Sequence, residues 1–261
     1  MSLPDHGPLI STFRLRRRTP GTFVLVPCER LGRSIRCQGQ LEAAAAQILV
    51  AAPAVKTLLE QPLRIDYAWR EQPPAIRLLA APPARCGQRT ERCSFIVPDF
   101  LVELASGKKW LVEVKPSARL SDPLVARKLA VGRLFAESRG WNYRVLTEQQ
   151  LFRGPVLRNV QLLARFGHWQ GSSDLLATIE ARVRESPATI ARLLLEAANH
   201  QPASTLLAAL FHLLATGRLD ADLLAAPLTD QTLVYLGGTF SWDPFDSVWA
   251  PDGSSTDGPS R

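Results

Sequence analysis

The sequence predicts an α/β protein in which a mixed sheet is followed by a mainly helical C-terminal region. Residues 100–104 and 110–114 are apolar and β-branched and flank Ala-Ser-Gly-Lys-Lys, a pattern typical of an antiparallel hairpin with a glycine-containing loop. Composition then shifts to Leu- and Ala-rich helical patterns. We expect three regions: residues 1–150, residues 151–239, and an acidic-aromatic, partly disordered tail at residues 240–261.

The first region alternates helical and strand patterns. Residues 40–52 are Ala-rich, carry Leu41, Ile48 and Leu49 at near-helical spacing and stop at Pro53, which predicts a helix. We expect strands at 63–69, 76–80 and 143–146 and an amphipathic helix at 121–140.

The second region predicts a helical bundle with a small wing. Pro187 and Pro202 are typical helix-start residues. The expected helix at 202–216 is poor in Arg and Lys, which favours docking to a protein over reading of DNA. The helices expected here cover residues 156–166, 173–185, 187–199 and 202–216, and short segments at 220–226 and 232–236 complete a winged-helix-like pattern.

Three charged residues converge in the predicted hairpin. Side chains alternate along a strand, so Glu113 and Lys115 share one face, and Asp99 begins the partner strand opposite them. Carboxylates and backbone carbonyls suit Mg²⁺ or Mn²⁺, and such ions with a nearby ammonium support phosphodiester hydrolysis. The alternative is an exposed hairpin with a solvated charged face. Glu103 lies too far along the strand to join the site, and we expect it to be structural.

The composition indicates a globular protein that binds a polyanion such as DNA. The chain is 46% hydrophobic and 21% charged, and it lacks an uninterrupted apolar stretch long enough to span a membrane, so we expect a cytoplasmic protein without membrane contact. The net charge is +7, and the cluster of Arg14, Arg16, Arg17 and Arg18 is the best candidate DNA-binding patch, with a solvated arm as the alternative.

The cysteines do not follow the spacing of common zinc sites. We expect reduced thiols, with a structural zinc clip as the less favoured alternative. They are Cys28, Cys37, Cys86 and Cys93.

The stretch Pro-Asp-Phe-Leu-Val-Glu-Leu-Ala-Ser-Gly-Lys-Lys-Trp-Leu-Val-Glu-Val-Lys-Pro closely resembles the core of the PD-(D/E)XK nucleases, and in detail the TnsA-type transposon endonucleases. Residues 33–42 and 55–67 resemble upstream blocks of that family, in the same order. The resemblance implies a restriction-endonuclease-like core and a winged-helix-like C-terminal domain.

The resemblance also implies roles for individual residues. Asp99 would bridge two Mg²⁺ ions, which Mn²⁺ can replace, and Glu42, Glu113 and the Val114 carbonyl would complete their coordination. Lys115 would orient the attacking water and stabilise the transition state. Glu42 in the first helical turn has an alternative role, because a carboxylate there interacts favourably with the helix dipole. Gln38-Gly39 departs from the Glu-Ser common in the family, which leaves the helix start open.

At the level of function, the resemblance implies the endonuclease subunit of a heteromeric cut-and-paste transposase in a bacterial, nucleoid-associated setting. It would cleave the 5′ ends of transposon-end DNA beside a DDE-type transposase, under an AAA+ regulator. Two alternatives remain open: a stand-alone repair or resolving nuclease, and a non-catalytic assembly factor.

The C-terminal tail combines aromatic and acidic residues. Phe240, Trp242, Phe245 and Trp249 occur among aspartates. Such a segment anchors a partner protein or packs on its own domain.

Overall fold

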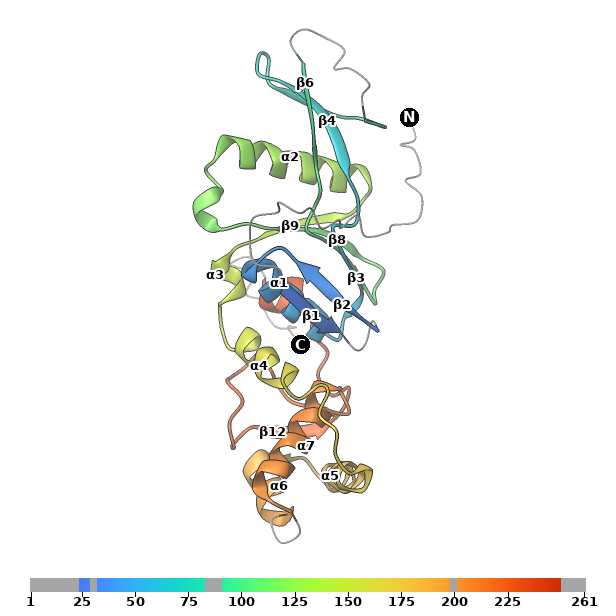
Figure 1. Ribbon diagram of the computed structural model, residues 1–261, viewed down its shortest axis with the longest axis vertical. Coiled ribbons are helices and arrows are strands. Elements are labelled where there is room, and N and C mark those ends of the chain that lie inside the picture. Colours follow the sequence, from blue (N-terminus) through green and yellow to red (C-terminus); the bar gives the residue numbers. More distant parts are fainter. Residues whose placement is uncertain (1–23, 29–31, 83–90, 198–200, 250–261) are drawn as a thin grey trace, which may run out of the picture. The chain divides into compact units, whose positions relative to one another are not determined.

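The computed structural model describes residues 24–28, 32–82, 91–197 and 201–249 (Figure 1). The expected arginine cluster at residues 14–18 lies outside these residues. The chain forms two compact units. The first unit comprises Met1–Ala46 and Val55–Gln149, and the second comprises Gln47–Ala54 and Gln150–Arg261.

A four-stranded sheet forms the centre of the first unit, with the order β3-β7-β8-β9. β3, β7 and β8 are antiparallel neighbours, whereas β9 runs parallel to β8. The expected α/β class with a mixed sheet is therefore confirmed. The strands are β3 (Val55–Glu60), β7 (Phe100–Leu104), β8 (Lys109–Val114) and β9 (Asn142–Leu146).

The hairpin of β7 and β8 matches the prediction, except that β8 begins one residue earlier at Lys109, and it contains a tight turn. Gly107 has a φ of +82° and donates its N–H to the Leu104 carbonyl at 2.9 Å. A positive φ of this kind is far more favourable for glycine than for other residues. Phe100 pairs with Val112 and Leu101 with Leu111. This register sets which side chains meet where the hairpin strands end.

Helix α2 (Pro123–Ser138) covers part of the sheet. The Asp122 side chain accepts a hydrogen bond from Leu124 N at 2.9 Å, and proline occupies the first helical turn, so the start of the helix is well defined. Its apolar face, including Val131 and Phe135, belongs to one buried cluster with Leu101 and Leu111. Helix α2 thereby buries the central strands.

A second, antiparallel sheet of the first unit has the order β5-β4-β6 and also packs against α2 (Figure 1). Strands at 63–69 and 76–80 were expected, and β4 and β5 occupy slightly different bounds; β6 was not expected. Its five residues mix polar and apolar side chains, and its pairing with β4 crosses a long connection, so local periodicity gives little signal. The strands are β4 (Ile65–Arg70), β5 (Ala75–Leu78) and β6 (Arg92–Ile96).

Helix α1 (Gln40–Ala51) and a two-stranded antiparallel sheet lie upstream of the central strands in the chain. The helix is deeply buried, with the alanines at 43–46 at most 3% exposed. The two strands are β1 (Val24–Cys28) and β2 (Arg33–Cys37).

The second unit contains a helical bundle and a small antiparallel sheet of order β10-β12-β11. Its core is one cluster of buried apolar side chains that includes Leu193, Leu210 and Val234. The helices are α3 (Glu148–Leu151), α4 (Val156–Ala164), α5 (Ser173–Glu185), α6 (Ile190–Ala197) and α7 (Ala203–Ala215), and the strands are β10 (Ala188–Thr189), β11 (Leu219–Asp220) and β12 (Leu233–Leu236).

The segment at 187–199, expected as one helix, is divided in two. Ala188 pairs with Val234 and Thr189 with Leu233, so the first residues join the sheet. The Thr189 hydroxyl then accepts a hydrogen bond from Arg192 N at 3.2 Å, as a helix N-cap does. Tertiary pairing thus displaces the helix start. The short segment expected at 220–226 overlaps β11 at Asp220 alone.

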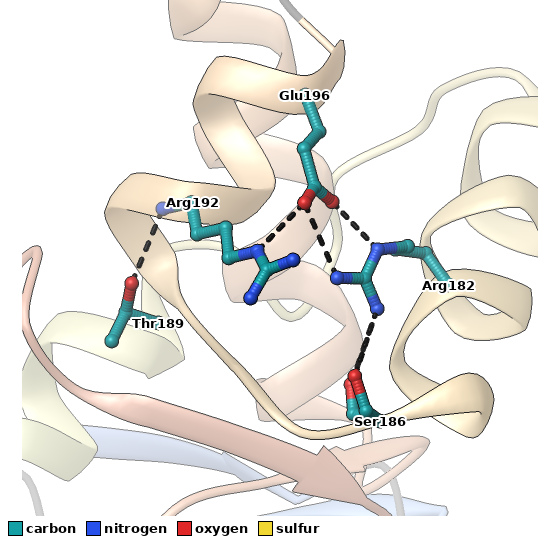
Figure 2. A network of polar contacts seen from close by, with 5 residues as sticks. All are labelled: Arg182, Ser186, Thr189, Arg192 and Glu196. Carbon is teal, nitrogen blue, oxygen red and sulfur yellow. Dashed lines mark hydrogen bonds and ion pairs between the residues drawn. The ribbon is translucent and has the colours of Figure 1, made fainter.

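Between α5 and α6, charged side chains form a network (Figure 2). Glu196 accepts hydrogen bonds from Arg182 Nε at 2.6 Å and Arg192 Nε at 2.7 Å. The Arg182 guanidinium also donates to Ser186 at 3.3 Å. The network links the two helices at the surface of the second unit.

The aromatic residues of the tail pack within this chain as far as the structure describes it. Trp242, Phe245 and Trp249 are 7%, 0% and 1% exposed, and a π-helical turn at Pro244–Val248 holds the last two rings edge to face. Of the two interpretations of the sequence, packing on the chain itself accounts for these side chains. Residues 250–261 lie outside the described part.

The cysteines depart in part from expectation. Cys28 and Cys37 are buried free thiols. Cys93 takes part in a disulfide bond, so the expectation of reduced thiols is wrong at this residue. Cys86 lies outside the described residues.

Candidate active site

Asp99 stands where β7 begins, opposite Glu113 on β8. Because Phe100 pairs with Val112, the residues immediately before and after this pair face each other across the strands. The Asp99 carboxylate accepts a hydrogen bond from Val114 N at 2.7 Å, which fixes its position. The hairpin therefore brings the two carboxylates together, as the sequence pattern predicted.

Lys115 provides the positive charge at this point. Its Nζ lies 2.8 Å from Asp99 Oδ2, 2.8 Å from Glu113 Oε2 and 3.0 Å from the Val114 carbonyl oxygen. The side chains of Asp99 and Glu113 are 10% and 6% exposed, whereas that of Lys115 is 27% exposed. Two carboxylates and one carbonyl thus bind a single ammonium at the edge of solvent.

Burial and neighbouring charges shift the pKa values of Glu113 and Lys115. Burial, and then repulsion from Asp99, raises the pKa of Glu113 to about 8, although Lys115 acts in the opposite direction. Burial alone lowers the pKa of Lys115, but attraction to Asp99 and Glu113 outweighs burial, so its pKa lies above the ordinary value. Lys115 therefore remains an ammonium at neutral pH, whereas a pKa of about 8 keeps most of the Glu113 carboxyl protonated there.

Glu42 lies in the first turn of α1 and contributes a third carboxylate. Its Oε2 accepts a hydrogen bond from Gln38 N at 2.7 Å, and Gly39, with a φ of +118°, precedes the helix. Burial, and then the charge of Asp99, raises the pKa of Glu42 to about 7, while Lys115 lowers it. Glu42 thus stabilises the helix start and lies within the electrostatic reach of the Asp99 site, although no direct contact joins them among the described residues.

Two further groups near the carboxylates were not singled out as site residues by the sequence. Burial, followed by the charges of Glu42, Glu60 and Asp99, raises the pKa of Cys37 to about 12, so this thiol stays neutral. Glu60 is 3% exposed and accepts two hydrogen bonds from Arg33 Nη1, at 2.7 and 3.0 Å. The inward alternation of β2 is the one sequence signal for Cys37.

Gln61 connects β3 to the site through the backbone. Its N–H donates to the Asp99 carbonyl at 2.8 Å, and its φ is +43°. A positive φ is uncommon for glutamine and has an energetic cost of about 1–3 kcal/mol, which the surrounding structure must offset. The hydrogen bond holds Asp99 against the end of β3.

The oxygen atoms around Lys115 are suitable ligands for a hard cation, provided that the Lys115 ammonium moves. Asp99, Glu113 and the Val114 carbonyl are oxygen donors, which Mg²⁺ and Mn²⁺ prefer, and they already converge on one positive charge. Within the described residues, no three His, Cys, Asp or Glu side chains lie close enough to share an ion. A divalent cation would therefore take the carbonyl as a donor and require the Lys115 ammonium to shift.

The region that contains Asp99, Glu113 and Lys115 matches a known protein family. Residues 52–148 match the family described as TnsA-like endonuclease N terminal. The chain contains a TnsA-like endonuclease domain. The search among curated proteins returned no match.

The TnsA-like domain includes Asp99, Glu113 and Lys115 within its matched residues, whereas Glu42 lies upstream of them. The match confirms the nuclease family inferred from the sequence, and the roles of the individual residues stay predictions. No helix in the described part of the chain combines the length and apolar character needed to cross a membrane.

Proposed function

We propose that this protein is the metal-dependent DNA endonuclease subunit of a heteromeric transposase. The observation that carries the proposal is the convergence of Asp99, Glu113 and Lys115 within the TnsA-like domain. It would cleave the 5′ ends of transposon-end DNA, while a DDE-type partner transposase processes the 3′ ends. An AAA+ regulator would control both.

The side chains divide the chemical work. Asp99, Glu113 and the Val114 carbonyl would hold Mg²⁺, Glu42 would complete the coordination, and the site would take two ions. Bound Mg²⁺ supplies Lewis-acid polarisation of the scissile phosphate and a more acidic water. Lys115 would donate hydrogen bonds to the oxygen atoms that gain charge in the transition state.

The second unit supports a winged-helix-like assignment. From α5 onward its element order is α5, β10, α6, α7, β11 and β12, with β10, β11 and β12 in one sheet. Helix α7 contains neither arginine nor lysine. Reading of DNA by this helix is therefore disfavoured, and we propose that this unit docks a protein partner, such as the regulator.

Calorimetry and cleavage assays together test the proposed function. Mn²⁺ or Mg²⁺ is titrated into wild-type protein and Asp99→Ala, and transposon-end DNA is then incubated with each protein, with and without the partner transposase. Metal binding that is abolished in the variant, with cleavage at the 5′ ends only when the transposase is present, supports the proposal. Cleavage without a partner would identify a stand-alone nuclease instead.

Absence of metal binding in both proteins would contradict the catalytic assignment. It would leave a non-catalytic assembly factor as the better explanation.

A further inference from the structure

Three side chains from three elements meet on the second sheet of the first unit. Trp69 lies on β4, and Arg92 lies directly opposite it on β6. Arg127 extends from α2, with its Cζ 3.3 Å from the centroid of the Trp69 ring, and the Cζ of Arg92 lies 5.4 Å from the same centroid. Both guanidinium groups are therefore within the range of a cation–π interaction with one indole.

These two arginines differ from their neighbours in having no carboxylate partner. Arg64 is paired with Asp66 at 2.7 Å and Arg77 with Glu91 at 3.1 Å. Among the described residues, neither Arg92 nor Arg127 forms a hydrogen bond or an ion pair. The contact with Trp69 orients the guanidinium groups without neutralising their charge.

Arg127 has an additional unsatisfied donor. Its Nε is buried and has no hydrogen-bond partner in the described structure. Most buried donors in proteins are paired, and an unpaired one costs about 1–3 kcal/mol. An anion that reached Arg127 would accept hydrogen bonds from a guanidinium that forms none within the described structure.

The stack is coupled to the candidate active site within one unit. Arg92 stands at the start of β6, seven residues before Asp99, and Arg127 stands in the second turn of α2, twelve residues after Lys115. Trp69 packs against the buried cluster that contains Leu101 and Leu111 of the hairpin. The arginines are thus held by the same core as the carboxylates.

Further positive charge lies on α2 beside Arg127. Lys128 and Arg133 are exposed and form no ion pair among the described residues. Cations without acidic partners attract a polyanion more strongly than neutralised arginines do. The exposed side chains of α2 therefore add positive charge to the same unit.

We propose that Trp69, Arg92 and Arg127 form a phosphate-binding stack that holds the backbone of duplex DNA on the same unit as the candidate active site. The inference rests on the proposed nuclease function and names a surface for its substrate. A planar guanidinium binds two phosphate oxygens at once, and an orientation fixed by the indole reduces the entropy cost of binding. Such contacts position the duplex and carry no base specificity.

Binding of a fluorescein-labelled DNA duplex by the full-length protein tests the proposal. Fluorescence anisotropy in the presence of EDTA measures binding without cleavage. For the Arg92→Ala/Arg127→Ala variant, we expect affinity to fall on the order of tenfold at low salt. The slope of log K against log salt should decrease by about 0.9 for each DNA phosphate that the variant no longer neutralises.

Arg77→Ala is the matched control. Arg77 is an exposed arginine on the same sheet, but it is paired with Glu91, so we expect unchanged affinity and salt slope. Arg127→Met, which keeps the aliphatic part of the side chain, separates the effect of charge from that of packing, and circular dichroism checks the fold of each variant. Lysine at both positions should recover the salt slope but only part of the affinity, because it cannot bind in a bidentate manner.

The proposal is overturned if the double variant binds with wild-type affinity and slope, or if Arg77→Ala weakens binding equally. It is also overturned if wild-type protein binds a single-stranded RNA of equal length as tightly as the duplex. The nuclease function is judged separately by cleavage with Mg²⁺ in the presence of the partner transposase. Arginine-dependent binding without cleavage would leave the stack standing and remove the proposed function, whereas cleavage with arginine-independent binding would do the reverse.

Discussion

The two units of this protein place carboxylates in opposite electrostatic situations. In the first unit, Asp99 and Glu113 share one ammonium in a nearly buried place, and the pKa of Glu113 is raised to about 8, chiefly by burial. In the second unit, Glu196 receives two guanidinium groups at the surface, and hydrogen bonds from Arg182 and then Arg192 lower its pKa to about 2 (Figure 2).

The difference in charge balance distinguishes a candidate metal-binding site from a structural ion-pair network. The surface network has more positive than negative charge and every oxygen of Glu196 is bonded, so it needs nothing further. The buried group has two carboxyls for one ammonium. Ionisation of both carboxyls is costly there, and an added cation would relieve that cost. Perturbed, under-neutralised carboxyls of this kind are more common at functional sites.

The largest expected effect comes from removing the acid at the centre of the buried group. Asp99→Ala should reduce DNA cleavage on the order of a thousandfold, because the variant lacks a donor for the cation and the carboxylate that positions Lys115. Glu103→Ala is the control on the same hairpin. Glu103 contacts Lys56 and Lys109 instead, so cleavage should stay near the wild-type rate. Equal losses in both variants would contradict the assignment of Asp99.

Arg33→Ala tests the buried carboxylate of Glu60, whose charge Arg33 neutralises. It leaves Glu60 buried without its partner, and we expect a loss of about 2–3 kcal/mol of unfolding free energy, reduced by the partial exposure of Arg33. Urea denaturation measures it. Lys56→Ala, which removes an exposed ion pair, should change stability by less than about 1 kcal/mol.

The pH dependence of stability should differ between the two regions. The folded-state pKa values of Glu42 and Glu113 are raised, so the stability they contribute is present below the unfolded pKa of about 4.5 and is lost as pH rises through about 7 and about 8. Without metal, the Tm should therefore fall between about pH 6 and pH 9. Glu113→Gln should flatten this fall, and a Tm that rises over the same range would contradict the pKa shifts.

Divalent metal should reverse that trend. Carboxylates bind a cation in their deprotonated form, so Mg²⁺ should raise the Tm of wild-type protein more at about pH 8 than at about pH 6. Differential scanning fluorimetry with and without Mg²⁺ measures the shift. Asp99→Ala should show almost no metal-dependent increase at either pH.

The smallest effect is expected in the surface network. Glu196 has a lowered pKa, so its contribution is present above about pH 4.5 and is lost as pH falls through about 2. Glu196→Gln should cause a small fall in Tm at neutral pH that diminishes at high salt, with DNA cleavage unchanged. A large, salt-independent destabilisation would show that the network is more than a screened surface link.

Much of the site was predictable because its residues are close in sequence. The hairpin periodicity places Asp99 beside Glu113, and strand alternation places Lys115 on the same face as Glu113. Glu42 was assigned from the family resemblance. The structure adds that the charge of Asp99 raises the pKa of Glu42 and that Glu42 accepts a hydrogen bond from Gln38 N. The assignment of its role awaits the metal titration.

Other features depend on contacts between distant segments. β6 was missed because it pairs with β4 across a long connection, and the first residues of the helix expected at 187–199 pair with β12 instead. The tail aromatics were equally compatible with two roles in the sequence. Burial of Phe245 and Trp249 decided between them.

The amino-acid sequence by itself determined the α/β class, the hairpin and the order of the acidic residues and the lysine, because these follow from local periodicity and turn chemistry. Only the tertiary structure decided that Arg92 and Arg127 meet on Trp69 and that the carboxyls outnumber their ammonium in a buried place. Strand pairing, burial and electrostatic coupling join residues far apart in the chain, and such contacts leave little trace in local patterns.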